Sequence, residues 1–589
     1  MRYLKLVRVY VALEKTSKRL EKTYIISEFL KQVPKSDLKD VINLLQGRVF
    51  APWDERKLGM SSRLLIKVIA NATGNSTSNI ESMWNRKGDL GLVTEELMEN
   101  KKQKTLFSTS LSVQKVVDNI SKLAEMEGEG TVHRKVGLIS ELLSGASKEE
   151  AKFIVRTVLE DLRTGVGDGT IRDSLVWTFD PKIVKEIFDF ENELKPVKKL
   201  TKEKREEYNI LLGKVQSAFD VATDFGLIAE IMKEKGFEGL KGTKMTVGKP
   251  IKVMLYPKAK NFEDAFETVG RPAAIEPKID GFRMQIHRSG EEVKLFTRRL
   301  EEVTKQFPDV VNVVMNNVRS KDFILDCEIL GIDKKTKRAI PFQNISQRIK
   351  RKYDIEKMSK TLPVVINIFD IVELNGENLL QVPLEERRKK LKAIVKNEKF
   401  KIELIEQIIT SDVKKAEKYY QDCLAKGHEG VMVKNLQGIY KPGSRVGYGM
   451  KMKPVMESLD LVIVKAEWGE GKRVKWLSSF TLACRDRDKL LEMGKVGTGI
   501  KEKSEEGVSF SELTLELKKM IIDDKGKEVT VKPRLVVEVN YEEIQKSTSY
   551  NSGYALRFPR VIRLRYDRGV KDISTLNEVE KIYNEQKKV

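Results

Sequence analysis

The segment AIEPKIDGFR, residues 274–283, is the strongest local signal in this chain. Strand side chains alternate between two faces, so an extended stretch over residues 274–280 would put Glu276, Lys278 and Asp280 on one face. A lysine between carboxylates is usually a solvated ion pair. The spacing alone therefore does not decide between an ordinary polar face and a reactive lysine.

Two residues of this segment indicate where Lys278 lies along its strand. Pro277 has no N–H to contribute to a ladder, which favours an edge or the end of a strand. Gly281 permits a turn shortly afterwards. We therefore expect Lys278 near the mouth of a loop.

A second acidic strand is predicted at FILDCEIL, residues 323–330. Asp326 and Glu328 would share one face, roughly 7 Å apart along the strand, opposite an apolar face. Oxygen ligands in this arrangement suit a hard divalent ion such as Mg²⁺. A polar sheet face that binds nothing is the alternative.

Two further segments combine a basic face with an apolar one. GMKMKP, residues 449–454, places Lys451 and Lys453 opposite two methionines. RVIRLRYD, residues 560–567, places Arg563 and Arg565 on one face. The same alternation predicts that the opposite face of this strand, Ile562, Leu564 and Tyr566, is half-buried. Paired cations of this kind bind phosphate, although each pair alone is commonly a solvated face.

The composition favours a polyanionic partner. Lysine and arginine number 109 against 87 acidic residues, which gives a net charge of +22 over 589 residues. Nucleic acid is the natural partner for such a charge. The alternative is a generally charged surface of the kind that thermophilic proteins carry.

Several classes of protein are disfavoured by what the chain contains. The three cysteines and three histidines are scattered, which argues against a zinc cluster or a disulfide framework. The apolar segment MRYLKLVRVYVAL carries Lys5 and Arg8 and is too short for a membrane span. We expect an intracellular protein that contacts no membrane.

The pattern of predicted helices and strands along the chain indicates three domains. Residues 1–241 have the pattern of helices, including one that begins at a capping box formed by Ser147 and Glu150. Residues 242–453 alternate short strands with helices, as in an α+β domain. Residues 454–589 are mostly short strands, typical of a small β-barrel.

These segments, taken in order, resemble the ATP-dependent DNA ligases of the archaeal and eukaryotic replicative type. The resemblance covers nearly the whole chain. It rests on KIDG with Arg283, FTRRLEEVT with Arg298, LDCEIL with Glu328, FDIVELNGENLL with Phe369, EGVMVK from Glu429 to Lys434, Lys451 with Lys453, and LRFPRVIRLRYDR. DLRTGVGDGTIRDSL resembles the helical DNA-binding domain of that family. Gly449 stands where the family often has tryptophan, Arg299 where it often has asparagine, and Arg568 where it often has lysine.

The resemblance implies an all-helical DNA-binding domain, an α+β nucleotidyltransferase (adenylation) domain and a C-terminal β-barrel OB-fold. It implies that Lys278, followed by Asp280 and Gly281, attacks the α-phosphate of ATP and carries the adenylyl group. The adenylyl group then passes to the 5′-phosphate of nicked double-stranded DNA, and the 3′-hydroxyl closes the nick. Such an enzyme serves replication, repair and recombination.

The resemblance also assigns roles to the neighbours of Lys278. Glu276 would read the adenine edge, Phe369 would stack on adenine, and Arg283 would hold the ribose or the 5′-phosphate. Glu328 and Glu429 would bind Mg²⁺ or Mn²⁺. The remaining nucleotide-binding positions are Arg298, Lys434, Lys451, Lys453, Arg563 and Arg565, the last two acting mainly while the lysine is loaded. Since a lysine nucleophile must lose its proton, we expect nearby cations such as Arg283, Lys451 and Lys453 to favour the neutral amine.

A partner is suggested by KKQKTLFS, residues 101–108. Gln103, Leu106 and Phe107 resemble a shortened sliding-clamp-binding motif, placed where archaeal ligases carry one. A charged loop with two core-facing apolar residues is the alternative. We expect an enzyme that acts as a monomer and binds a sliding clamp.

Three other functions share parts of this pattern. RNA ligases and mRNA-capping guanylyltransferases use the same lysine chemistry but lack the helical domain. NAD-dependent ligases carry a cysteine zinc module, which these scattered cysteines cannot form. A non-catalytic DNA-binding protein would have no need of Lys278 with both acidic motifs. The preference among ATP, ADP and GTP, the preferred metal and the working temperature stay open.

Overall fold

The computed structural model describes residues 1–54, 56–99, 110–189, 195–196, 201–340, 342–349, 353–443, 447–454, 457–502 and 507–588. The chain forms two compact units. The first comprises Met1–Ser61 with Thr105–Lys453, and the second comprises Ser62–Lys104 with Pro454–Val589. The bounds of the three domains expected from the sequence stay predictions. The clamp-motif residues Gln103, Leu106 and Phe107 lie outside the described residues.

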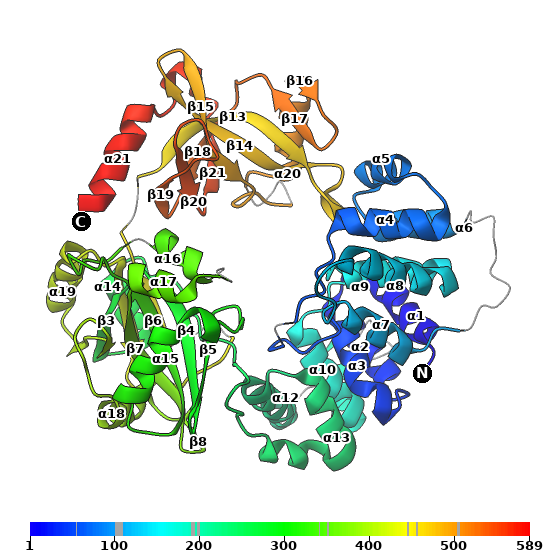
Figure 1. Ribbon diagram of the computed structural model, residues 1–589, viewed down its shortest axis with the longest axis horizontal. Coiled ribbons are helices and arrows are strands. Elements are labelled where there is room, and N and C mark those ends of the chain that lie inside the picture. Colours follow the sequence, from blue (N-terminus) through cyan, green and yellow to red (C-terminus); the bar gives the residue numbers. More distant parts are fainter. Residues whose placement is uncertain are drawn as a thin grey trace. The chain divides into compact units, whose positions relative to one another are not determined.

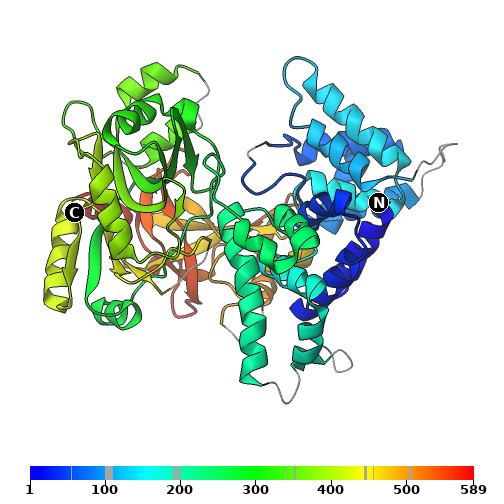
Figure 2. The ribbon, with the colours of Figure 1, turned by 90° about the horizontal axis from the view of Figure 1, so that it is seen from below.

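The N-terminal part of the first unit is helical, as predicted. Helix α9 (Lys148–Val158) begins at the capping box of Ser147 and Glu150, which is confirmed. The helices, blue to teal in Figures 1 and 2, are α1 (Tyr3–Glu14), α2 (Arg19–Leu30), α3 (Lys35–Leu45), α7 (Val113–Lys122), α8 (Thr131–Gly145), α9, α10 (Asp168–Phe179), α11 (Pro181–Ile187), α12 (Lys202–Ala222) and α13 (Phe225–Gly239). The two-residue strands β1 (Phe188–Asp189) and β2 (Lys195–Pro196) pair between α11 and α12.

The rest of the first unit contains a four-stranded sheet in the order β10-β3-β11-β12. Its strands are β10 (Ile408–Thr410), β3 (Ala273–Lys278), β11 (Gly430–Asn435) and β12 (Gly449–Met452). Helices α14 (Phe262–Val269) and α19 (Val413–Ala425) pack against one face and bury its apolar side chains. The opposite face is free to carry polar groups.

A second sheet follows β3 directly along the chain. Its strands are β5 (Glu292–Thr297), β4 (Phe282–Ser289), β6 (Asp322–Gly331), β7 (Val364–Leu374), β8 (Glu377–Asn378) and β9 (Ile402–Leu404). Among the helices beside it are α15 (Pro308–Asn317), α16 (Phe342–Ile349), α17 (Ile355–Thr361) and α18 (Leu384–Ile394). The chain leaves the first sheet just after Lys278 and enters the second at Phe282, so the link between them carries the KIDG segment.

The second unit is rich in strands. A sheet joins β15 (Lys489–Val496), β14 (Leu477–Asp486), β13 (Leu459–Trp468), β17 (Glu528–Val531), β16 (Ile521–Asp524), β18 (Val536–Asn540) and β21 (Arg560–Leu564), and a hairpin pairs β19 (Glu543–Lys546) with β20 (Tyr554–Arg557). The helices are α4 (Ser62–Thr73), α5 (Thr77–Lys87), α6 (Leu90–Glu99), α20 (Phe510–Lys518) and α21 (Leu576–Lys588). The predicted β-rich C-terminal region is thereby confirmed.

One prediction about this unit is wrong in part. Ile562, Leu564 and Tyr566 of RVIRLRYD were expected to form a half-buried face. Leu564 is half-buried and packs against the core, but Ile562 is 43% exposed and Tyr566 is 68% exposed. Strand β21 pairs only with β18 among the described strands, and the pairing contains an irregularity at Glu538 and Val539. It is Val561 that enters the core. An irregularity of register changes which side chains point inward.

Two further observations concern the cysteines and the helices of the described residues. All three cysteines are free and buried. No helix in this part of the chain is long and apolar enough to cross a membrane.

Candidate active site

Lys278 is the last residue of β3 and lies on the polar face of the four-stranded sheet. In the register, Glu276 lies across from Met432 of β11, and Met432 lies across from Lys451 of β12. The intervening residues face α14 and α19 and are buried, among them Ile275, Val431, Val433, Met450 and Met452. The predicted alternation therefore holds over β3. Asp280 does not continue the strand as expected, because β3 ends at Lys278.

The Lys278 ammonium group lies against a carboxylate from a distant part of the chain. Its Nζ is 2.5 Å from Oε2 of Glu429, and Lys453 Nζ is 3.1 Å from the same oxygen. The Glu429 backbone N–H also donates to the Lys278 carbonyl oxygen at 2.8 Å. Burial alone would raise the pKa of Glu429, but the charges of Lys278 and Lys453 and a hydrogen bond from Lys278 lower that pKa to about 2.

A second lysine–carboxylate pair lies deeper on the same face. Lys434 Nζ is 2.5 Å from Glu276 Oε2, and both side chains are almost fully buried. Gln407 Nε2 donates to the other oxygen, Oε1, at 2.8 Å. The predicted Glu276 and Lys434 are therefore neighbours across β3 and β11.

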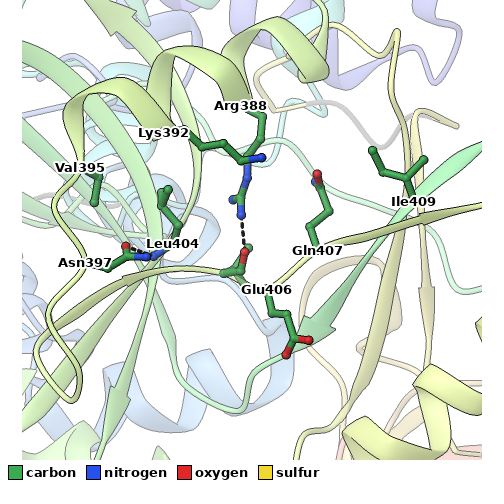
Figure 3. A pocket seen from close by; sticks show the side chains of 9 residues that line it. Arg388, Lys392, Val395, Asn397, Leu404, Glu406, Gln407 and Ile409 are labelled. Carbon is green, nitrogen blue, oxygen red and sulfur yellow. Dashed lines mark hydrogen bonds between the residues drawn. The ribbon is translucent and has the colours of Figure 1, made fainter.

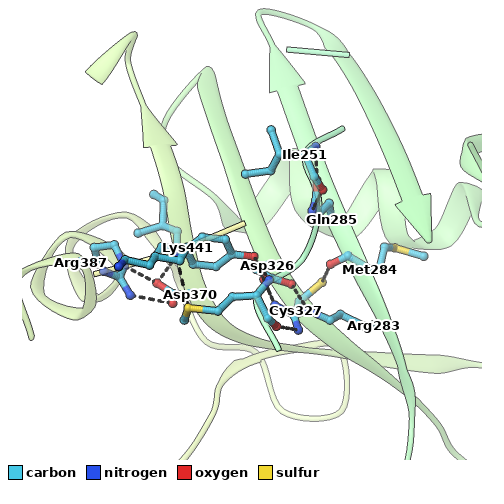
Figure 4. Close-up of polar contacts among 12 residues, drawn as sticks. Ile251, Arg283, Met284, Gln285, Asp326, Cys327, Asp370, Arg387 and Lys441 are labelled. Carbon is cyan, nitrogen blue, oxygen red and sulfur yellow. Dashed lines mark hydrogen bonds and ion pairs between the residues drawn. The ribbon is translucent and has the colours of Figure 1, made fainter. Parts of the chain in front are cut away.

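Arg283 is held by a carboxylate on the neighbouring strand of the second sheet. Its Nε and Nη2 donate to the two oxygens of Asp326 at 2.8 and 2.5 Å, as Figure 4 shows. Tyr440 donates to Asp326 Oδ2 at 2.7 Å. Although burial alone would lower the pKa of Arg283, Asp326 raises it well above its ordinary value.

This pairing limits the acidic face predicted over residues 323–330. Asp326 is 1% exposed and is committed to Arg283, so Glu328 is the residue of the pair that stays available. Burial raises the pKa of Glu328 to about 8, helped by the nearby Glu429 and Asp326, while Lys278 and Arg283 act in the opposite direction. Near Lys278, the pKa of Glu328 is therefore above the ordinary glutamate value of 4.5 and the pKa of Glu429 is below it.

The ring of Phe369 lies over this region because of a β-bulge. In the register of β6 and β7, Asp326 pairs with Asp370 and Cys327 pairs with Ile368, which leaves Phe369 as the extra residue. Bulges re-aim a side chain. The Arg283 guanidinium carbon is 5.2 Å from the ring centroid and Lys434 Nζ is 4.9 Å from it. The predicted aromatic therefore lies beside two of the predicted cations.

Comparison with known proteins decides the family. Residues 2–176 match the family described as DNA ligase N terminus, residues 253–453 match the ATP dependent DNA ligase domain, and residues 473–568 match the ATP dependent DNA ligase C terminal region. The chain is 47% identical over 591 residues to the DNA ligase of Nanoarchaeum equitans, covering 100% of this chain and 99% of that one. It is 40% identical to the DNA ligase of Methanopyrus kandleri, covering 99% of both chains.

This chain belongs to the ATP-dependent DNA ligases. The resemblance found in the motifs is confirmed, as are the enzyme class and the use of ATP. A solved structure named Pmar-Lig_PreS3 has the same fold, with a TM-score of 0.57 at 17% identity, covering 95% of this chain and 99% of that one.

Two glycines of this ligase allow its strands to approach closely at the site. A Cβ on Gly281 would lie 2.3 Å from the Ile329 carbonyl oxygen. A Cβ on Gly430 would lie 2.0 Å from the Met452 carbonyl oxygen, and Gly430 has φ +140°. Gly281 is thus needed for close approach, and Gly430 for both approach and backbone conformation.

Three predicted residues of this ligase form no hydrogen bond or ion pair with that cluster among the described residues: Arg298 of the first unit, and Arg563 and Arg565 of the second. Arg298 is exposed in the turn after β5. Arg563 Nε bonds Glu538 Oε2 at 2.6 Å in the second unit. Arg565 Nη1 lies 3.0 Å from Asp460 Oδ2, and its Nη2 lies 2.8 Å from Asp567 Oδ2.

The motifs missed several residues that support the site. Arg387 of α18 makes a two-pronged pair with Asp370, at 2.7 and 2.9 Å, and thereby fixes the strand beside Phe369 (Figure 4). Tyr440 and Gln407 were missed as well. Each lies more than a hundred residues from the carboxylate that it contacts. No spacing rule could have connected them.

Proposed function

We propose that this ligase forms its enzyme-adenylate on Lys278. The supporting observation is the position of the lysine, at the end of β3 and on the same sheet face as Glu276, Lys434 and Lys451. The ε-nitrogen attacks the α-phosphorus, a nitrogen–phosphorus bond forms, and the bond to the bridging oxygen of pyrophosphate breaks. A protonated amine has no lone pair, so Lys278, which is paired with Glu429, must lose its proton before the attack.

The neighbours of Lys278 position the nucleotide. We propose that Glu276 reads the adenine edge, that Phe369 stacks on the base, and that Arg283 contacts the ribose or the 5′-phosphate. Lys451 and Lys453 hold phosphates. Lys434, which was expected to bind phosphate, forms an ion pair with Glu276 instead. This pairing supports a role for Lys434 near the adenine base.

Glu328 and Glu429 are proposed to hold Mg²⁺, or Mn²⁺ in its place. No group of three or more His, Cys, Asp or Glu side chains in the described part of the chain is arranged to hold a metal by itself. Two carboxylates fit Mg²⁺, which usually keeps several waters and shares its shell with substrate phosphates. A bound Mg²⁺ supplies charge that stabilises the pyrophosphate leaving group.

Arg563, Arg565 and Arg298 are proposed to act during loading of the lysine. Planar guanidinium groups match phosphate geometry. We expect the two arginines of the second unit to orient the pyrophosphate and Arg298 to contact the nucleotide or the DNA phosphates.

The central test uses ATP labelled at the α-phosphate. The wild-type protein should become labelled and should pass the label to nicked DNA, and Lys278→Ala should acquire no label. Lys260→Ala, which removes an exposed lysine of the same unit, should be labelled normally. Label that survives on Lys278→Ala would reject the assignment of the nucleophile.

We propose that this ligase seals nicks in replication, repair and recombination, and that it binds DNA mainly through phosphates. Nicks occur in every sequence, so base readout has no use here. The net charge of +22 supports a binding constant that falls steeply with salt. A binding constant that does not change between low and physiological salt would reject this mode of binding.

We also propose that the ligase works as a monomer and binds a sliding clamp through Gln103, Leu106 and Phe107. Light scattering should give one chain of 67.4 kDa. Phe107→Ala should lose stimulation of ligation by the clamp while keeping its activity without the clamp. Unchanged stimulation would reject the clamp motif.

A further inference from the structure

Gln407 lies directly beside the carboxylate proposed to read the base. Strands β10 and β3 pair Thr410 with Ala273, Ile409 with Ala274 and Ile408 with Ile275. Continuing that register by one residue puts Gln407 across from Glu276, and residues directly opposite in a sheet share a face. Gln407 therefore extends the row that Glu276, Met432 and Lys451 form across the sheet.

The Glu276 carboxylate is held from two sides. Gln407 Nε2 donates to Oε1 at 2.8 Å and Lys434 Nζ lies 2.5 Å from Oε2. The carboxylate is 1% exposed, and a buried charge is tolerated only when it is paired and hydrogen-bonded. A carboxylate oxygen has about two acceptor sites, so each oxygen can still accept one more N–H.

Gln407 is itself positioned by the strand segment that precedes it. The Ile405 N–H donates to the Ile368 carbonyl oxygen at 2.9 Å, and Ile368 is the residue before Phe369. Arg388 of α18, which is nearly fully buried, donates to the Ile405 carbonyl oxygen. The same short segment is therefore tied both to the aromatic residue and to the base-reading carboxylate.

A pocket of about 460 Å³ lies beside this segment, and Gln407 is one of the residues that line it. Figure 3 shows that Gln407 and Glu406 point in opposite directions from adjacent positions. The pocket is lined by Arg388, Lys392, Val395, Asn397, Leu404, Ile405, Glu406, Gln407 and Ile409. Glu406 pairs with Lys426 at 3.6 Å, so the two adjacent side chains have separate partners.

We propose that Gln407 is a positioning residue that sets the base preference of the adenylation step. Its amide holds the Glu276 carboxylate in the orientation that accepts a hydrogen bond from the 6-amino group of adenine. Guanine carries an oxygen at that position, and an acceptor facing a carboxylate is repelled. Without the Gln407 amide, the Glu276 carboxylate rotates so that both oxygens face Lys434. The 6-amino group of adenine then has no acceptor. This inference rests on the proposed role of Glu276.

The test measures KM and kcat of enzyme-adenylate formation with ATP and with GTP. Gln407→Leu removes the donor and keeps a branched side chain that is one atom shorter. It should raise KM for ATP by about tenfold to a hundredfold, the range that corresponds to one hydrogen bond to a charged group. Its kcat should change less than about threefold, and its preference for ATP over GTP should narrow.

Two controls separate positioning from general damage. Glu406→Gln alters the adjacent residue and should behave like the wild type. Single-turnover sealing of a preformed DNA-adenylate should be unaffected in Gln407→Leu, because the bound DNA already holds the adenylate in place. Equal loss of sealing and of adenylation would overturn the inference in favour of a structural role.

Glu276→Gln distinguishes the two levels of the proposal. If this variant leaves the ATP-to-GTP ratio unchanged, the proposed role of Glu276 is wrong, and the inference fails with it. If it changes the ratio while Gln407→Leu does not, the role of Glu276 stands and the inference alone is overturned.

Discussion

Alternation of side chains predicted one polar and one apolar face for both β3 and β21. Only β3 has the two faces as predicted. On β3, Lys278 and Glu276 lie on one face while Ile275 is fully buried on the other. In RVIRLRYD, Arg563 of β21 and Arg565 just after it hold carboxylates, but Ile562 and Tyr566, which were expected to be half-buried, are exposed.

The difference lies in what surrounds each strand. Strand β3 has a partner on both sides, and α14 and α19 cover one of its faces, so inward and outward directions are defined. Strand β21 pairs only with β18 among the described strands, with an irregular register. Alternation predicts faces reliably only where packing gives the two faces different environments. The most deeply buried pairs, Lys434 with Glu276 and Arg283 with Asp326, lie in the β3 region. In the β21 segment the Arg565–Asp460 pair is largely buried, but the Arg563 side chain is 63% exposed.

The largest expected effect comes from breaking a desolvated pair. Arg283→Met leaves Asp326 buried without its guanidinium, and removing one member of a buried pair costs about 3–5 kcal/mol. Urea denaturation monitored by fluorescence measures the change. Arg563→Met is the matched control, because its side chain is 63% exposed and surface pairs contribute at most about 1 kcal/mol. Equal losses would remove the distinction between the two regions.

The second effect concerns the close approach of Gly430, the first residue of β11, to the end of β12. Gly430→Ala should destabilise the protein by about 2–4 kcal/mol, because the new Cβ meets a carbonyl oxygen and φ is +140°. Thermal denaturation tests it. Gly290→Ala, with φ +58° and no atom within 4 Å of the added Cβ, should cost about 1 kcal/mol. A Gly430→Ala protein as stable as Gly290→Ala would contradict the close approach.

The third effect separates the two regions by reaction step. Arg565→Ala should slow enzyme-adenylate formation by about tenfold or more, since paired cations stabilise the departing phosphates. Sealing of preformed DNA-adenylate should be largely retained, because no pyrophosphate leaves in that step. Rapid-quench assays of each step measure both rates. Lys489→Ala, on β15, removes an exposed cation of the same unit and should change neither rate.

The most gradual effect is a dependence of stability on pH in metal-free buffer. The pKa of Glu328 is raised from 4.5 to about 8, so the folded state keeps a proton that the unfolded state loses. Its contribution is fully present below pH 4.5 and is lost as the pH rises through 8, with a slope of at most about 1.4 kcal/mol per pH unit. Glu328→Gln should flatten this decline in denaturation curves recorded from pH 5 to 8.

Glu429 should show the opposite sign. Its pKa is lowered from 4.5 to about 2, so its contribution is present above pH 4.5 and is lost as the pH falls toward 2. Glu429→Gln should therefore destabilise the protein at neutral pH and lose less stability on acidification. Matching pH profiles for the Glu328 and Glu429 variants would show that the two carboxylates do not differ as described.

Local patterns identified the elements of the central site but not its contacts. The strands over AIEPKIDGFR and FILDCEIL, the helix after Ser147 and the buried methionines of GMKMKP were all predictable, because alternation, capping and turn residues act over a few positions. The partner of Asp326 was not, since the Asp-x-Glu spacing does not tell which carboxylate an arginine will take. The bulge that turns Phe369 was also invisible, because it depends on the register of two strands.

The sequence by itself determined the order of the motifs, and with it the family and the lysine proposed as nucleophile. Those conclusions need only residue types and their spacing along the chain. Tertiary structure alone decided that Glu429 and Lys453 share the surroundings of Lys278, and that Gln407 and Lys434 hold Glu276. The contacts of Lys278 with Glu429, and of Glu276 with Gln407 and Lys434, join residues separated by well over a hundred positions. They arise because sheet register, set by the burial of the apolar face, brings distant polar side chains to one surface.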